Sequence, residues 1–234
     1  MLDVKKLLND YKPINYKIWD RTGQGNNILS LFTPLEKDIW LKAYDFQDKR
    51  DDAGHVENVT CFAVKLIEYI PKANRNIVIP AAILHDTGWS QMTDTELKLF
   101  YISNWKDYEK PLRENHQKKS VEVADKILTQ VKHPQEFRRD ILEIISQHDT
   151  RDGFSSLEDG VVRDADKLWR YTLPHLELTL NKRNKTPEEL REDVYGYFSK
   201  PKFFYSDISK EIGRIEFEHA MEIYKIRESK EDKK

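Results

Sequence analysis

The sequence is poor in cysteine and has no long apolar run, and each shortage excludes a class of protein. Cys61 is its only cysteine, so no intrachain disulfide can form, and a reducing, cytoplasmic environment is expected. The longest strongly apolar run, 77–84, is far shorter than the ~20 residues that a membrane helix requires. Residues 1–19 lack the apolar core of a signal peptide. We therefore expect a soluble protein that has no membrane partner.

Neither sign of charge is in large excess. The chain has 39 Lys and Arg against 41 Asp and Glu, which leaves a net charge of −2. A protein that binds nucleic acid or an anionic membrane normally carries a basic excess, so no nucleic-acid-binding surface is expected. Five Trp, ten Phe and eleven Tyr supply enough aromatic surface for a packed core, which excludes a disordered polyelectrolyte.

Apolar residues recur at three- and four-residue steps almost throughout, and no alternating run of strand length occurs. This period predicts an all-α helical bundle in one domain. Helices are predicted over 4–11, 34–49, 55–70, 77–86, 94–105, 111–131, 134–148, 157–171, 187–197 and 206–227. The core is expected to span 34–175. An N-terminal helix and loop, 1–33, are expected to pack on it, and 176–227 to form a C-terminal helical extension of the same domain, before a charged tail, 228–234, that frays.

Two helix ends carry specific signals. Thr33 and Pro34 are the residue types preferred at the N-cap and first helical position, and they predict the start of the helix over 34–49. Gly88 follows the apolar helix over 77–86, where a glycine can supply a C-terminal cap.

Four of the seven histidines fall on inward faces of different predicted helices, at helical spacing from aliphatic residues. Two aspartates share this property, one directly after a histidine and one between Val162 and Trp169. The set consists of His55, His85, Asp86, His116, His148 and Asp166.

Burying these groups together is costly unless something compensates the cost. An unpaired buried carboxylate is driven to its neutral form, and aliphatic neighbours cannot satisfy several polar rings. A divalent cation resolves the conflict, because its charge stabilises carboxylates and it binds imidazole lone pairs. The alternative is a group of helix-end hydrogen bonds and exposed side chains that cluster only along the sequence. The joint occurrence of the His85-Asp86 doublet and Asp166 favours the cation.

The flanking residues add specificity. His55 stands in Gly-His-Val-Glu-Asn-Val, the doublet in Ile-Leu-His-Asp-Thr-Gly, and Asp166 in Arg-Asp-Ala-Asp-Lys-Leu. Over roughly 37–171 the sequence thereby resembles the HD-domain superfamily of metal-dependent phosphohydrolases, whose skeleton is a His, a His-Asp doublet and a distant Asp in an all-α fold. Asp166 rather than Asp164 matches the family's ligand, because it precedes the basic-Leu pair.

The resemblance also bears on the number of ions. Some family members carry two further histidines between the doublet and the last Asp, where His116 and His148 lie here, and these hold a second metal. The resemblance implies that Asp86 bridges two ions. His55, His85 and Asp166 complete the first site, and His116 and His148 complete the second. A one-metal enzyme, in which the last two imidazoles bind phosphate oxygens, stays open. Mn, Fe, Mg, Co and Ni all suit mixed nitrogen and oxygen ligands.

The implied reaction is hydrolysis of a phosphate ester or anhydride, in a nucleotide or another small phosphorylated metabolite, through a metal-activated water. Asp86 is its expected central carboxylate. Cations that share a helix face with a ligand, or follow one, are expected to contact the phosphate; these are Lys119, Arg151, Arg163 and Arg170. Self-association into a homo-oligomer stays open.

Departures from individual branches leave the substrate unspecified. Trp89 stands three residues after Asp86, where the bacterial deoxynucleotidase branch has Glu, and the Gly-Tyr-Pro signature of cyclic-dinucleotide hydrolases is absent. Two other function classes share the pattern. One comprises mixed-valent di-iron oxygenases with the same six ligands, and the other comprises regulatory modules that keep a metal only as a structural element.

Overall fold

The computed structural model describes residues 4–14, 28–49, 54–99, 106–183 and 185–231, and in these ranges every regular element is a helix. The predicted all-α class is therefore confirmed. The α-helices are α1 (Val4–Leu7), α2 (Pro34–Ala43), α3 (His55–Tyr69), α4 (Arg75–Leu84), α5 (Asp94–Lys98), α6 (Lys106–Gln130), α7 (Gln135–Gln147), α8 (Leu157–Leu168), α9 (Leu173–Arg183), α10 (Pro187–Ser199) and α11 (Asp207–Glu231). Short 3₁₀ helices are η1 (Ile28–Leu31), η2 (Tyr44–Phe46), η3 (Thr87–Gln91) and η5 (Trp169–Tyr171). Among the described helices, none combines the length and apolar character needed to cross a bilayer.

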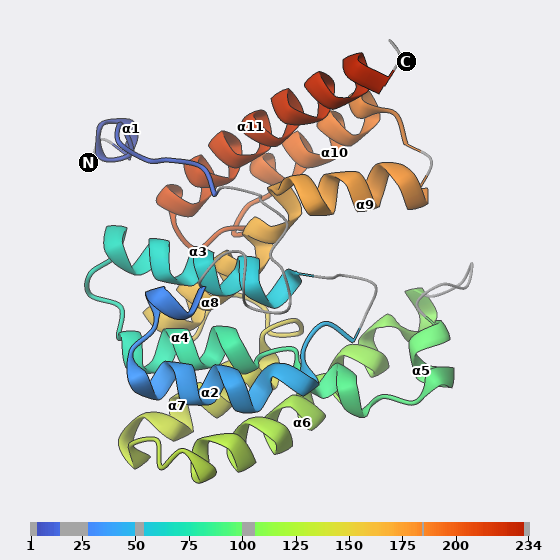
Figure 1. Ribbon diagram of the computed structural model, residues 1–234. Coiled ribbons are helices and arrows are strands. Elements are labelled where there is room, and N and C mark those ends of the chain that lie inside the picture. The colour runs from blue at the N-terminus through green and yellow to red at the C-terminus, as the bar shows by residue number, and fades with distance from the viewer. Residues whose placement is uncertain (1–3, 15–27, 50–53, 100–105, 184, 232–234) are drawn as a thin grey trace.

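Helix α4 lies at the centre of the bundle. Every residue of 77–84 is buried, and α4 packs against α2, α3, α7 and α8 (Figure 1). Its apolar character on all sides, visible in the sequence, is the signature of a helix enclosed by others. Because α4 is held from several directions, the residues at its C-terminal end have a well-defined position.

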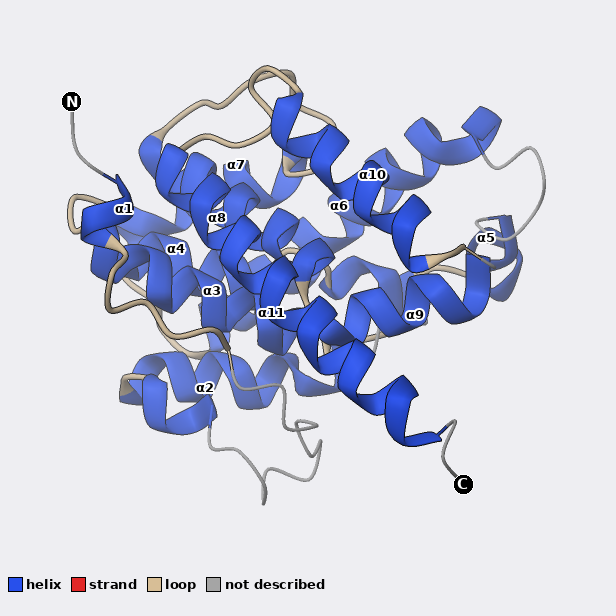
Figure 2. Ribbon diagram, turned by 90° about the horizontal axis from the view of Figure 1, so that it is seen from above, coloured by secondary structure: helices blue, strands red, loops and turns tan. Residues whose placement is uncertain are grey.

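The last three helices gather beside this core. Helix α11 packs on α8, α9 and η5, and it crosses the bundle from end to end (Figure 2). The N-terminal segment docks against it, because the Tyr11 hydroxyl donates to the buried Glu216 carboxylate and the backbone N–H of Ile14 donates to Glu216 Oε1 over 2.9 Å.

Most predicted helices are present, with shifted ends. Thr33 caps α2 as expected, in a reciprocal pair of hydrogen bonds with Glu36. This helix ends at Ala43 and continues as η2 to Phe46, short of the predicted 49. Asp48, which has a left-handed backbone (φ 51°), then accepts from the backbone N–H groups of Gly54 (3.0 Å) and Val56 (3.5 Å) at the start of α3. Helix α8 likewise ends at Leu168 and continues as η5.

The two ends of the chain also differ from the prediction. Helix α1 is shorter than 4–11, and α11 continues to Glu231 beyond the predicted end at 227, so 228–231 are helical rather than frayed. Helix α9 lies at the junction between the predicted core, 34–175, and the predicted helical extension, 176–227, and no separate helix was predicted there. Pro174 is tolerated because it occupies the first turn. Residues 100–105 of the predicted helix 94–105, 15–27 of the N-terminal loop and 232–234 of the tail lie outside the described residues.

Gly88 does not cap α4 as predicted. The helix ends at Leu84, and Gly88 lies in η3 without a left-handed backbone. Its role is close approach, because a Cβ atom there would lie 2.0 Å from the backbone oxygen of His116 and 2.4 Å from the backbone nitrogen of Ser120. The Gly88 N–H instead donates to Ser120 Oγ over 2.8 Å, which fixes α6 against η3.

We expect Gly88→Ala to lower the free energy of unfolding by about 1–3 kcal/mol, because the added methyl group meets backbone atoms that cannot rotate away. Urea unfolding measures the change. Gly196→Ala, on the exposed side of α10 with open space around the new Cβ, is the matched control and should be neutral or slightly stabilising. Equal midpoints for the two variants would contradict the close approach.

Candidate metal centre

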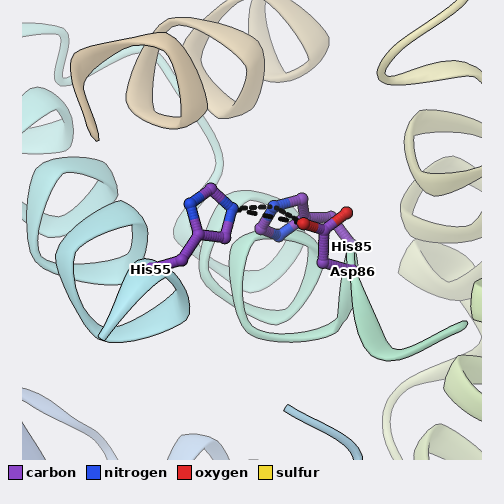
Figure 3. A group of neighbouring side chains, drawn as sticks. All are labelled: His55, His85 and Asp86. Atoms are coloured by element: carbon purple, nitrogen blue, oxygen red, sulfur yellow. Dashed lines mark hydrogen bonds and ion pairs between the residues drawn. The ribbon is translucent and has the colours of Figure 1, made fainter. Parts of the chain in front are cut away.

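Three side chains from α3 and the end of α4 point toward one another. His55 is the first residue of α3, and His85 and Asp86 follow the last residue of α4 (Figure 3). The His55 and His85 Nε2 atoms lie 3.1 Å apart, and Asp86 Oδ2 lies 3.3 Å from the first and 3.6 Å from the second. Asp166 on α8 adds Oδ1 at 3.4 Å from His55 Nε2 and 3.8 Å from His85 Nε2. We call these four residues the first group.

A second group lies on the other side of the same aspartate. His116 on α6 and His148 at the end of α7 have their Nε2 atoms 3.3 Å apart. Asp86 Oδ1 lies 3.3 Å from each of these nitrogens. The two oxygens of Asp86 thus face different histidine pairs, Oδ2 toward the first group and Oδ1 toward the second.

Hydrogen bonds at two helix ends determine which ring nitrogens face the centre. His85 Nδ1 lies 2.9 Å from the carbonyl oxygen of Ala82, and His148 Nδ1 lies 2.8 Å from that of Ile145. A carbonyl can only accept, so each Nδ1 carries a proton. These carbonyls belong to the last helical turn, where no backbone donor reaches them, and the imidazoles satisfy them. Nε2 is therefore the ligating atom in both residues.

The pKa values of the imidazoles shift in different directions, even within the second group. Burial lowers the pKa of His85 and of His116, so both rings are neutral at pH 7 and offer lone pairs. Burial also lowers the pKa of His148, but the carboxylates of Asp149 and Asp86 outweigh it and raise that pKa to about 9. His148 Nε2 lies 3.3 Å from Asp86 Oδ1, so a proton on this nitrogen and a bound cation would compete for the same carboxylate oxygen.

These contacts decide between the two interpretations of the sequence. Ligand atoms bound to one ion at about 2.0–2.2 Å can be at most roughly 4.4 Å apart. Every separation given above within a group is 3.8 Å or less. The six residues therefore converge from five helices. His55, His85 and Asp86 form one buried set, and Asp86, His116 and His148 form another, and within each set the ligand atoms lie within 4.8 Å of one another, close enough to hold a metal ion. Buried Nε2 atoms that face each other at 3.1 and 3.3 Å repel unless a proton or cation lies between them.

His116 is held differently from the other ligand candidates. Its ring stacks on Trp89, with centroids 4.1 Å apart and planes at 10°, and its buried Nδ1 has no hydrogen-bond partner among the described residues. Trp89 stands three residues after Asp86, where the deoxynucleotidase branch has a glutamate, and here its ring supports His116 from one face. This role was not predicted from the sequence.

Three of the four predicted phosphate-binding cations have protein partners. Lys119 donates to the carbonyl of Gln91 (2.7 Å) and pairs with Glu96 (3.6 Å). Arg151 pairs with Glu143 and Asp159, at 3.2 and 3.5 Å. These contacts tie both side chains to neighbouring elements.

Arg163 donates to the backbone oxygens of Arg151 and Gly153 and thereby orders the loop before α8. Arg170 differs, because it is half-buried, lies over the Tyr197 ring at 6.0 Å and has no carboxylate partner in the described ranges. Arg170 is thus the one of the four predicted cations that has no anionic or carbonyl partner among the described residues. Asp164 accepts from the N–H groups of Tyr205 and Ser206, so it points away from the centre as predicted.

Asp149 was missed by the sequence analysis. Its Oδ2 lies 3.7 Å from His116 Nε2 and 3.9 Å from His148 Nε2. Burial raises the pKa of this carboxyl group, but His148, Arg113 and His116 outweigh burial and hold it well below its usual range. A signal was present, because His148-Asp149 repeats the doublet His85-Asp86 at a second helix end.

Residues 52–171 match the family model of the HD domain. The matched segment begins just before His55 and ends just after Asp166, so it includes both groups. Searches of curated proteins and of solved structures found no match.

We expect Asp86→Ala to abolish metal binding, because Asp86 is the carboxylate shared by both groups, with Oδ2 facing His55 and His85 and Oδ1 facing His116 and His148. The content of Mn and Fe in purified protein, measured by mass spectrometry, is the readout. Asp152→Ala, at an exposed position in the loop after α7, is the control. Full metal content in Asp86→Ala would show that the site is assigned wrongly.

His148→Ala should instead retain one ion per chain, because the four residues of the first group are intact. The same measurement applies. Loss of all metal in this variant would indicate that the two groups form one jointly built centre.

Proposed function

We propose, because this chain belongs to the HD-domain family, that it is a metal-dependent phosphohydrolase which cleaves a phosphate ester or anhydride of a nucleotide or another small phosphorylated metabolite. The observation that carries the proposal is the position of Asp86, whose two oxygens face two different histidine pairs. A divalent ion held there would supply a Lewis acid for a phosphoryl oxygen and would lower the pKa of a water molecule far below its ordinary value.

The protein's own contribution is to orient these ligands. The hydrogen bonds from His85 and His148 to helix-end carbonyls direct Nε2 inward, and the stack on Trp89 orients His116. Such outer contacts determine tautomer and ring orientation in metal sites. Because the rings are held before any ion binds, little reorganisation is needed on loading.

Exposure indicates where a substrate approaches. The histidine side chains of both groups are at most 4% exposed, whereas Asp166 is 20% and Asp149 is 15% exposed. The centre is therefore reached from the side of these two carboxylates. A buried centre of this kind suits the phosphoryl group of a small molecule better than a macromolecular surface.

Phosphate release from a panel of nucleotides and sugar phosphates tests the proposal. Protein loaded with Mn, Co, Mg, Ni or Fe should release phosphate or pyrophosphate with at least one ion. A chelator should abolish the activity, and adding back the ion should restore it. Asp86→Ala, treated in the same way, shows the background.

Two outcomes would contradict hydrolysis. Fully loaded protein that releases no phosphate from any compound would favour a structural role for the metal. Turnover of the iron form that requires dioxygen, measured after anaerobic purification, would favour the oxygenase class.

We expect Arg170→Ala to raise KM about tenfold or more without changing metal content, because a charged hydrogen bond to a phosphate oxygen contributes about 1.5–3 kcal/mol. Lys119→Ala should change KM less than twofold, since Glu96 and the Gln91 carbonyl already engage that amine. Steady-state kinetics with the best substrate of the panel compares them, and Arg139→Ala, far out on the surface, is the control. The same KM for Arg170→Ala and the control would exclude Arg170 from substrate binding.

A further inference from the structure

Asp149 is a largely enclosed carboxylate, 15% exposed, that the six-residue pattern does not include. It follows His148 in the turn after α7, and its Oδ2 is directed at the second group rather than at solvent. The nitrogens it approaches are His116 Nε2 and His148 Nε2, at 3.7 and 3.9 Å, and these are the ligating atoms rather than the outer Nδ1 atoms.

We propose that Asp149 is a further ligand of the ion held by Asp86, His116 and His148. Both separations are below the roughly 4.4 Å that one ion permits between two of its ligand atoms. With Asp149 the second group has two imidazoles and two carboxylates, as the first group has with Asp86 and Asp166. The inference rests on one part of the proposed function, that the centre binds metal, and it does not depend on which reaction is catalysed.

The carboxylate is held in place by residues of α6. Arg113 Nη1 lies 2.6 Å from Asp149 Oδ2, and Arg113 Nε is in turn bound by Glu109 at 3.0 Å. Gln117, which is buried, accepts from the backbone N–H of Asp149 over 3.0 Å and donates to Thr150 Oγ1 over 3.0 Å.

These contacts position Asp149 before any ion binds. Residues 113, 116 and 117 lie at helical spacing on one face of α6, so the same face presents His116 and holds the turn that follows His148. A carboxylate oxygen has enough lone pairs to accept from a guanidinium and to bind a cation at once. Ligating carboxylates commonly have such hydrogen-bonded support.

The competing interpretation is an ion pair with Arg113 that has only a structural role. A second ion pair would account for the approach to His148, whose pKa is raised, but not for the approach to His116, whose pKa is lowered. The same oxygen, Oδ2, faces both Arg113 and the two Nε2 atoms, which favours ligation.

Titration of metal-free protein with Mn²⁺, followed calorimetrically, distinguishes the two interpretations. Asp149→Asn keeps the shape of the side chain and a carbonyl oxygen for Arg113, but it removes the negative charge. We expect the first equivalent to bind as in the unaltered protein and the second to bind at least about tenfold more weakly. Unchanged binding of the first equivalent shows that the variant is folded. Asp152→Asn, three residues along and exposed, should bind both equivalents normally.

A second variant and a spectroscopic measurement test independently whether Asp149 is a ligand. Asp149→Glu retains the carboxylate, so it should bind the second ion more tightly than Asp149→Asn. With Co²⁺, the visible absorption of the second equivalent should change in Asp149→Asn, because a ligand is lost. The proposal is overturned if Asp149→Asn binds the second ion with the original affinity, or if the unaltered protein binds a single ion. Two bound ions without any phosphate release would overturn the proposed hydrolysis and leave this inference standing.

Discussion

The mutual approach of four imidazole Nε2 atoms around one carboxylate is the constraint on which the rest of the structure depends. Nitrogens at 3.1 and 3.3 Å from each other cannot all keep unshared lone pairs in a buried site. The packed helices force this approach, because α4 is enclosed on several sides and Gly88 allows α6 to come into backbone contact with η3. The stability of the bundle thus holds together groups that would separate in water. A cation relieves the repulsion. The rigid core keeps the ligands close together, which makes the site suited to a cation.

The chain uses the same local solution twice. Helices α4 and α7 each end at a histidine that donates from Nδ1 to the carbonyl three residues earlier, and each histidine is followed by an aspartate. The helix end provides the unsatisfied carbonyl, and the histidine satisfies it while turning Nε2 inward. One short motif therefore ends the helix, fixes the tautomer and places a carboxylate beside the ring. The proposed role of Asp149 follows from this parallel as well as from its distances.

The local and periodic features were predictable from the sequence, whereas the features that depend on long-range approach were not. Helical spacing places His116 and His148 inward, and Thr33-Pro34 identifies the start of α2, because both depend on residues within a few positions. The support of His116 by Trp89 and the contact of Gly88 with α6 join segments about 30 residues apart in sequence, and periodicity carries no information about them. The same limit explains why the partners of the predicted phosphate-binding cations were not foreseen. Helical spacing places Lys119 and Arg163 near ligands, but their partners, Glu96 and the carbonyl of Arg151, come from other elements.

The charge of the centre links the number of ions to the class of substrate. Asp86, Asp149 and Asp166 bring three negative charges, and Arg113 is the cation in direct contact with one of them, so these four groups sum to −2 at neutral pH when the carboxyls are ionised. One divalent ion neutralises the sum, whereas two leave a net charge of +2. At short range and low dielectric, this difference decides whether a phosphate dianion is attracted. With a single ion, recognition of the phosphate would depend on a side-chain cation, for which we propose Arg170, while two ions would make the centre itself the anion-binding site. The ligand set is acidic, and without ions it would repel an anionic substrate. When both groups hold their ions, the centre is positively charged and an anionic substrate fits it.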